Sequence, residues 1–239
     1  MSKLTFNYRF KRSDRTELIY SVVVDSETLN VLTPDHDNEP DWTLLEYNQC
    51  DHCPLNKEDS PRCPVAKNLH RLLTTFEKTQ SIDIYEVQVE TPERTYTKNT
   101  DIQNSLGSLF GLIMATSSCP TMSFLKPMAR FHLPFSTIEE TIFRSLGSFL
   151  ISKYLEKSTI DKNEVNNDLT KNYKLVNAVN RNLIARIQHL INKKTSGDAD
   201  QNAIVILDTL AVLLTMELGQ NVDLISKLYH LKKSERKPS

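Results

Sequence analysis

Residues 4–11 read Leu4-Thr5-Phe6-Asn7-Tyr8-Arg9-Phe10-Lys11, with an apolar side chain at every second position. Successive side chains of an extended chain point to opposite faces, so this alternation places the four apolar side chains on one face. The sequence therefore predicts a β-strand with one buried face at the start of the chain.

Other short runs predict further strands around the first one. Residues 18–24 and 29–32 are mostly apolar and are separated by the polar turn Asp25-Ser26-Glu27-Thr28, which completes an antiparallel meander. Residues 85–89 and 94–98 alternate again on either side of Thr91-Pro92-Glu93, the pattern of a hairpin. The expected antiparallel sheet has about five strands.

Apolar residues at steps of three and four predict helices in much of the remaining chain. A short amphipathic helix should begin at Pro64, and helices should follow from Ile102, over 142–154 and over 165–190. Gly107 and Gly111 suit close helix packing. The polar residues of the long helix are expected at the surface or in hydrogen bonds between helices: Asn177, Asn180 and Arg181.

One more helix is expected from about Asn202, and its segment 203–214 is apolar nearly all round. Such a helix lies at the centre of a bundle or is covered by a second copy of the chain in a homodimer. The predicted fold class is α+β, in which a cysteine-rich metal loop at 50–63 joins the sheet to a C-terminal helical bundle. We expect a β part over 1–100, a helical part over 101–232 and a frayed tail over 233–239.

Composition narrows the classes of function. The 239 residues carry 29 Lys and Arg against 30 Asp and Glu, so a net charge of −1 provides no basic field for nucleic acid. The start lacks the apolar core of a signal peptide, and no run reaches the roughly 18 apolar residues of a spanning helix. We expect a cytoplasmic protein without membrane insertion. The 5 glycines form no phosphate-binding motif.

The cysteines predict a metal site. Cys50 and Cys53 form a C-x-x-C turn that can direct both sulfurs to one ion, and Cys63 supplies a third thiolate. Cys119 is the preferred fourth ligand, and the competing candidates are His52, His70 and His132. Structural zinc is expected. An iron–sulfur cluster is the alternative, because it also binds four thiolates and because three of the cysteines precede proline, a dipeptide that occurs at cluster ligands. The other interpretation is four free, partly buried thiols.

A second candidate site lies between Cys119 and Arg144, where three prolines impose an irregular path. Its chemistry-bearing side chains are Cys119, Arg130, His132, Glu140 and Arg144. Free backbone N–H groups beside a helix N-terminus would bind an anion, and a cysteine with a histidine can act as nucleophile and base. The alternative is structural: Phe131, Leu133 and Phe135 fill the core. Ser136 or Thr137 would then form a helix N-terminal capping box with Glu139 or Glu140, of which Glu139 is preferred.

Several motifs together resemble an uncharacterised family of bacterial cytoplasmic proteins. They are the C-x-x-C-P-L loop at 50–55, Pro92-Glu93-Arg94-Thr95-Tyr96, residues 111–117, Cys119-Pro120 and residues 127–135, which read PMARFHLPF. The resemblance covers residues from about 1 to 215. It implies a bacterial cytoplasmic setting and carries no activity, so no catalytic residue follows from it.

Three functions fit these observations. The leading one is a metal-stabilised regulatory or protein-interaction module, whose partner is an unidentified protein or small ligand. The second is an enzyme that uses a pocket around Cys119, Arg130, His132 and Glu140. The third is a redox or metal sensor that uses the thiols directly, for which oxidation would release the metal reversibly.

Overall fold

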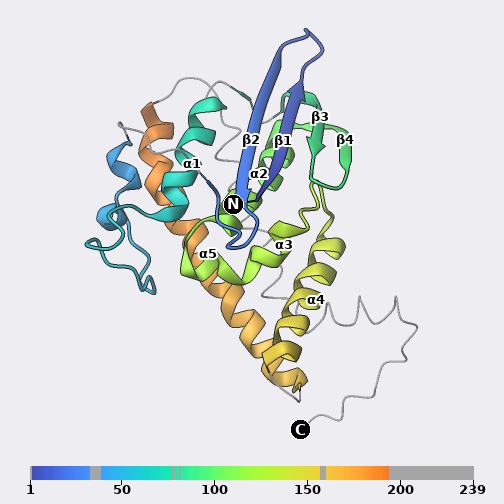
Figure 1. The fold of residues 1–239 in the computed structure, drawn as a ribbon. Coiled ribbons are helices and arrows are strands. Elements are labelled where there is room, and N and C mark those ends of the chain that lie inside the picture. Colours follow the sequence, from blue (N-terminus) through green and yellow to red (C-terminus); the bar gives the residue numbers. More distant parts are fainter. Residues whose placement is uncertain (1, 33–38, 77–78, 81, 157–159, 194–239) are drawn as a thin grey trace, which may run out of the picture.

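The structure is a computed structural model that describes residues 2–32, 39–76, 79–80, 82–156 and 160–193 (Figure 1). The helix expected over 203–214, with the homodimer contact assigned to it, and the tail over 233–239 lie outside the described residues. The described chain is α+β, with an N-terminal antiparallel sheet followed mainly by helices.

The sheet has four strands, β1 (Lys3–Lys11), β2 (Glu17–Asp25), β3 (Ile84–Glu90) and β4 (Thr95–Asp101), in the order β2-β1-β3-β4. All neighbours are antiparallel, and Tyr8 of β1 lies opposite Tyr20 on one side and Val89 on the other. The alternation at the start of the chain correctly predicted β1 and its buried face, because Phe6, Tyr8 and Phe10 are all buried.

The expected third strand of the meander, residues 29–32, is reduced to a single bridge between Val24 and Val31. Leu29 has a φ of 54°, which turns the chain out of an extended course. The Val31 N–H then donates to the Thr116 carbonyl at 2.8 Å, at the end of a helix. Because the Val31 N–H is bonded to Thr116, it cannot pair with a neighbouring strand and extend the sheet. The prediction of about five strands therefore exceeds the four strands of the described residues by one.

Among the described residues, five α-helices and three short 3-10 helices follow or interrupt the strands. The α-helices are α1 (Pro64–Thr75), α2 (Ile102–Thr116), α3 (Lys126–Arg130), α4 (Ile138–Glu156) and α5 (Lys162–Lys193). The 3-10 helices are η1 (Asp41–Thr43), η2 (Leu45–Tyr47) and η3 (Pro120–Leu125). Pro64 occupies the first position of α1, where its missing N–H has no intrahelical partner to lose.

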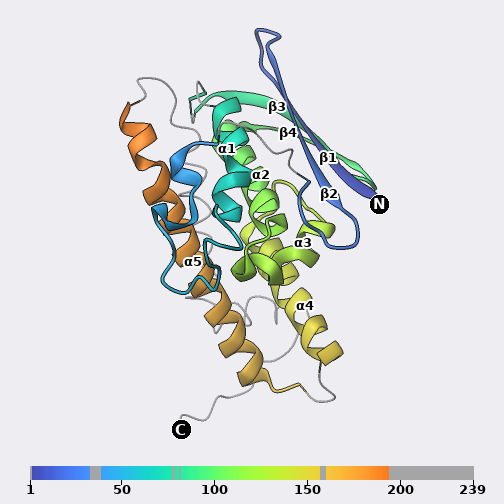
Figure 2. The same cartoon turned by 60° about the vertical axis from the view of Figure 1, so that its left-hand side comes forward.

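Helices α1 and α2 lie against the sheet, and α5 packs on their far side (Figure 2). Helix α2 is central: it contacts α1, α3, η3, β3 and β4, and most of its residues are buried. One continuous hydrophobic core contains Phe6 of β1, Leu69 of α1, Phe110 of α2 and Leu183 of α5. The sheet and the helices are thus joined by shared apolar contacts.

None of the described helices has, on its own, both the length and the apolar composition that crossing a membrane requires. Ile102–Thr116 and Pro120–Arg130 reach these limits only as a pair, and the two parts meet at an angle of 114°.

Candidate ligand-binding site

A cavity of about 420 Å³ lies between α2, η3, α3, α4 and α5, with β4 at its edge. Its wall on α2 is formed by small residues at intervals of four, Gly107, Gly111 and Ala115. Residues four apart occupy the same face of a helix, and without long side chains they leave open space beside the backbone. The two glycines expected to bring helices close together therefore line a cavity.

The opposite walls are apolar and adaptable. Met122 of η3 and Met128 of α3 line the cavity there, together with Leu125 and Val176. Methionine has three rotatable bonds and a polarisable sulfur, so it adjusts to ligands of different shape. This lining is suited to a largely apolar molecule.

The charged groups at the cavity are all basic. Lys98 of β4 and Arg144 of α4 line it, and none of the described residues in its lining is Asp or Glu. The Arg144 Nη2 donates to the carbonyls of Met128 and Phe131, each at 2.8 Å, which fixes the guanidinium in place. Within the described part of the chain, no carboxylate lies within 4.0 Å of Arg144, and Glu140 acts on its charge only from a longer distance.

Burial lowers the pKa of Arg144, which reflects its removal from water and not a loss of charge. Lys98 is exposed, and its Nζ lies 5.9 Å from the centroid of the Phe135 ring. Phe135 itself has a φ of 59°, an unusual backbone conformation for an aromatic residue, and its N–H donates to Ser108 Oγ at 2.9 Å. Strained backbone of this kind is found most often at ligand sites.

Asn180 of α5 is a buried polar residue of the cavity lining. The residue is 1% exposed, and its Oδ1 is buried without a hydrogen-bond partner among the described residues. Asn177, one turn earlier, is 4% exposed and also has an unpaired Oδ1, but it does not line the cavity. A buried amide oxygen without a partner is costly, so both asparagines lower the stability of the fold.

His132 connects the cavity to the sheet. Its Nε2 and the hydroxyl of the fully buried Tyr8 are joined by a hydrogen bond of 2.5 Å, and its ring lies edge-on to Phe6 at 5.7 Å. Burial, and then the positive charge of Arg144, lower the pKa of His132 to about 3. His132 is therefore a neutral imidazole at physiological pH, and burial also raises the pKa of Tyr8.

Residues 5–230 match the family described as "Domain of unknown function (DUF6901)". The chain belongs to this family. The expected membership in an uncharacterised family is thereby confirmed. No curated protein and no solved structure matches the sequence.

Two other residues of the predicted pocket have structural contacts in this DUF6901 chain. The Arg130 Nη1 lies 2.9 Å from Glu93 Oε1, and its guanidinium lies 5.2 Å from the centroid of the Phe131 ring. Arg130 is not among the residues that line the cavity.

Glu140 forms a capping box at the start of α4. The Thr137 N–H donates to Glu140 Oε2 at 2.7 Å, and the Glu140 N–H donates to Thr137 Oγ1 at 3.2 Å. These bonds lower the pKa of Glu140. The sequence predicted a capping box here but assigned it to Glu139, and the structure assigns it to Glu140.

The four cysteines are free thiols located away from the cavity lining. Cys50, Cys53 and Cys63 lie in the segment between η2 and α1, where the Cys53 N–H donates to the Cys50 carbonyl at 2.9 Å. Cys119 is buried at the start of η3. The described residues contain no group of three or more His, Cys, Asp or Glu arranged to hold a metal ion.

Cys50 and Cys63 pack against the hydrophobic core that contains Cys119. Burial raises the pKa of Cys50 to about 12, and the other three cysteines act in the same direction, in the order Cys63, Cys119, Cys53.

The histidines considered as ligands have other surroundings. His70 makes an edge contact with Trp42 at 5.8 Å, and His132 contacts Tyr8. The Nε2 of His52, inside the C-x-x-C turn, is buried without a hydrogen-bond partner among the described residues.

Sequence reasoning missed two groups at the cavity of this DUF6901 member. Lys98 is one of several polar residues on the alternating strand β4, and nothing in its local pattern marks it. Asn180 was expected at the surface or in a hydrogen bond between helices, yet it is buried with an unpaired oxygen, as is Asn177, whereas Arg181 is exposed. The sequence signal that could have found Asn180 is its position as a polar residue among the apolar positions of a long helix.

Proposed function

We propose that this protein is a regulatory module that binds a small molecule with an apolar body and an acidic group in the cavity beside α2. The observation that carries the proposal is the cavity of about 420 Å³, lined by Lys98 and Arg144 and by no carboxylate. Ligand pockets of this size are typically apolar, with a few polar groups that orient the ligand.

Each part of such a ligand has a matching wall. The methionines and the small residues of α2 accept the apolar body, while a carboxylate beside Arg144 forms the short, charge-assisted hydrogen bonds that guanidinium groups favour. The acidic group should contribute more to selectivity than to affinity, because Lys98 is exposed and its charge is screened.

The enzyme alternative has less support from the described residues. Cys119 does not line the cavity, Glu140 caps α4, and His132 is a neutral ring hydrogen-bonded to Tyr8. A nucleophile paired with a base is therefore not assembled at the cavity. Ligand binding without catalysis is therefore the simpler function for this cavity. Because the cavity lies within the shared hydrophobic core, a bound ligand can shift the conformational equilibrium of the whole domain.

The proposal is tested with anilinonaphthalene sulfonate, a fluorescent aromatic anion, as the probe. We expect the full chain to bind it in the cavity, and decanoate to displace it far better than decanol, which lacks the acidic group. Lys98→Gln should weaken probe binding several-fold, by the loss of one charge near the anion.

Lys11→Gln is the matched control, because Lys11 is also an exposed lysine on the sheet but does not line the cavity. Equal displacement by decanol and decanoate would exclude the acidic group. Absence of probe binding, or equal weakening by both lysine variants, would refute the cavity as the ligand site.

A further inference from the structure

Helix α4 has apolar side chains on two opposite sides, and its inner side is fixed on α5. The Ser145 Oγ lies 2.7 Å from the Tyr173 hydroxyl oxygen. Nearer the end of α4, the Lys153 Nζ lies 2.9 Å from Asp168 Oδ2. Phe149 is buried on the same side. These contacts set the rotation of α4 about its axis and direct its other side away from the core.

The outer side of α4 carries an exposed apolar row. Residues two positions apart on a helix differ by about 200° in direction, so Gly147 lies opposite both Ser145 and Phe149. Gly147 is the middle of a series at steps of four, to which one neighbouring aromatic residue is added: Phe143, Gly147, Ile151, Leu155 and Tyr154. The four large side chains are between 48% and 79% exposed. We call these five residues the outer row of α4.

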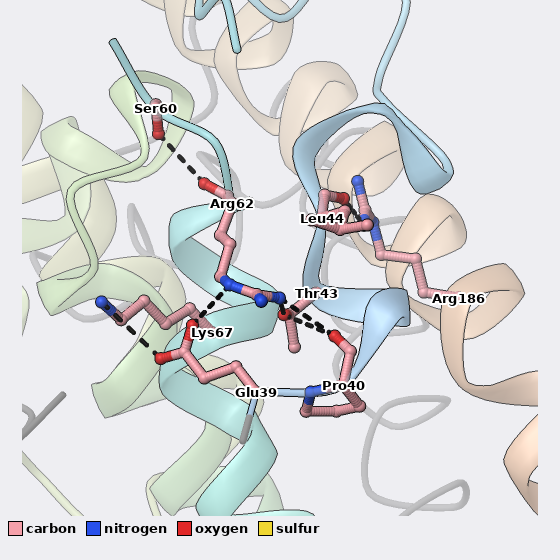
Figure 3. Close-up of polar contacts among 8 residues, drawn as sticks. All are labelled: Glu39, Pro40, Thr43, Leu44, Ser60, Arg62, Lys67 and Arg186. Atoms are coloured by element: carbon pink, nitrogen blue, oxygen red, sulfur yellow. Dashed lines mark hydrogen bonds and ion pairs between the residues drawn. The ribbon is translucent and has the colours of Figure 1, made fainter. Parts of the chain in front are cut away.

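Elsewhere the chain covers its own helices. The segment before α1 is fastened by a polar network (Figure 3), in which the Arg62 Nε lies 2.7 Å from Glu39 Oε2. On α5, the Arg186 Nη1 donates to the Leu44 carbonyl at 2.6 Å, and η1 contacts both α1 and α5. The outer row of α4 has no comparable cover among the described residues. An apolar face of this kind usually marks an interaction site.

We propose that the outer row of α4 is the contact between two copies of this chain, related by a two-fold axis at Gly147. Residues at steps of four form a ridge along a helix, and the commonest packing of two helices interdigitates such ridges. Phe143 and Ile151 each lie four positions from Gly147. Antiparallel copies that cross at Gly147 therefore place Phe143 against the partner's Ile151, and the row is complementary to itself, as a two-fold contact requires.

Gly147 suits the centre of this contact. A Cβ added there would meet nothing within 4 Å, so a single copy has open space at this point. Glycine inside a helix lowers the stability of the helix relative to alanine, and the close approach of a second helix compensates this loss. The missing side chain leaves a notch in the row at which the two helices can come close.

The exposed area is sufficient for a specific contact. At roughly 200 Å² for each large side chain, the exposed fractions amount to about 500 Å² on each copy. Two copies together bury about 1,000 Å², which is the lower limit for specific association. We therefore expect a reversible dimer and not a permanent one.

The apolar segment 203–214 of the same chain is the alternative cover. Figure 1 shows that α5 begins beside the end of α4 and then runs away from it. The 32 residues of α5 extend about 48 Å. The ten steps from Lys193 to Ala203 span at most about 36 Å, which is less than the length of α5. A second copy has no such connection to satisfy, and this inference does not depend on the cavity or on its ligand.

The test is the mass of the full chain in solution, measured by sedimentation equilibrium over a range of concentrations. We expect a reversible dimer. Ile151→Lys should raise its dissociation constant more than about tenfold, because symmetry brings two unpaired charges into one contact. Ser152→Lys is the matched control, since Ser152 is exposed and turned by about 100° from Ile151, and it should change the constant less than about twofold.

A photocrosslink tests the register of the contact. Ile151→benzoylphenylalanine should crosslink to residues around Phe143 of a second copy, and a mixture with isotope-labelled chain shows whether two copies are joined. Three results would overturn the proposal: a monomer at every concentration, a dimer that Ile151→Lys leaves unchanged, and a crosslink within one chain to the segment 203–214. If Ile151→Lys proves insoluble, Tyr154→Lys replaces it, and the crosslink is still measured.

Discussion

The two unpaired asparagines of α5 give the most discriminating prediction. Asn177 and Asn180 are both buried and both have an Oδ1 without a partner, but only Asn180 lines the cavity. Replacing either by Ala should therefore stabilise the folded protein, and only Asn180→Ala should weaken binding of anilinonaphthalene sulfonate.

Three contributions set the size of the stabilisation. Removing the unpaired oxygen recovers a desolvation cost of about 1–3 kcal/mol. The higher helix propensity of Ala adds roughly 0.6 kcal/mol. The lost contacts of the amide group subtract about 1 kcal/mol. The free energy of unfolding should rise by about 0.5–2.5 kcal/mol, which corresponds to about 1–5 °C in Tm for a chain of this length.

The assay is thermal unfolding of the two variants and the unaltered chain, followed by probe titration of all three. A fall in Tm for both variants would show that the amide oxygens have partners in the folded protein, and it would refute the reasoning about the orphaned acceptor. A rise in Tm with equal loss of probe binding would show that α5 as a whole, and not Asn180, shapes the cavity.

Three other contacts give predictions of their own. Tyr8→Phe leaves the His132 Nε2 without its partner and should lower the free energy of unfolding by about 1–3 kcal/mol in urea; a change near zero would exclude that hydrogen bond. Because the pKa of His132 is about 3 when folded and about 6.5 when unfolded, the unfolded chain binds more protons between these values. Stability should fall by about 2 kcal/mol from about pH 6.5 to 5, and this part of the pH dependence should be missing from urea unfolding of His132→Asn. Thr137→Val removes the capping box of α4 and should lower the free energy of unfolding in urea by about 1 kcal/mol, whereas Glu139→Gln should lower it less. The reverse order would show that Glu139, and not Glu140, forms the capping box.

Local patterns determined most of the secondary structure. The alternation from Leu4 to Lys11 became β1, the run around Thr91 became the β3–β4 hairpin, and Pro64 began α1. These features are encoded locally, because the period of two or of 3.6 residues follows from backbone geometry within a few neighbours. The α+β class and the capping box before α4 could be predicted for the same reason.

Contacts between distant parts of the chain decided the rest. Val31 pairs with Thr116, so the fifth expected strand does not extend, and the glycines of α2 face open space instead of another helix. Lys98 and Arg144 meet at one cavity although 46 positions separate them in the sequence. Cys119 belongs to the buried core, which follows from the packing of η3 and not from its local sequence. Such juxtapositions leave no periodic signal in the sequence, because they arise when each element buries its apolar face against another.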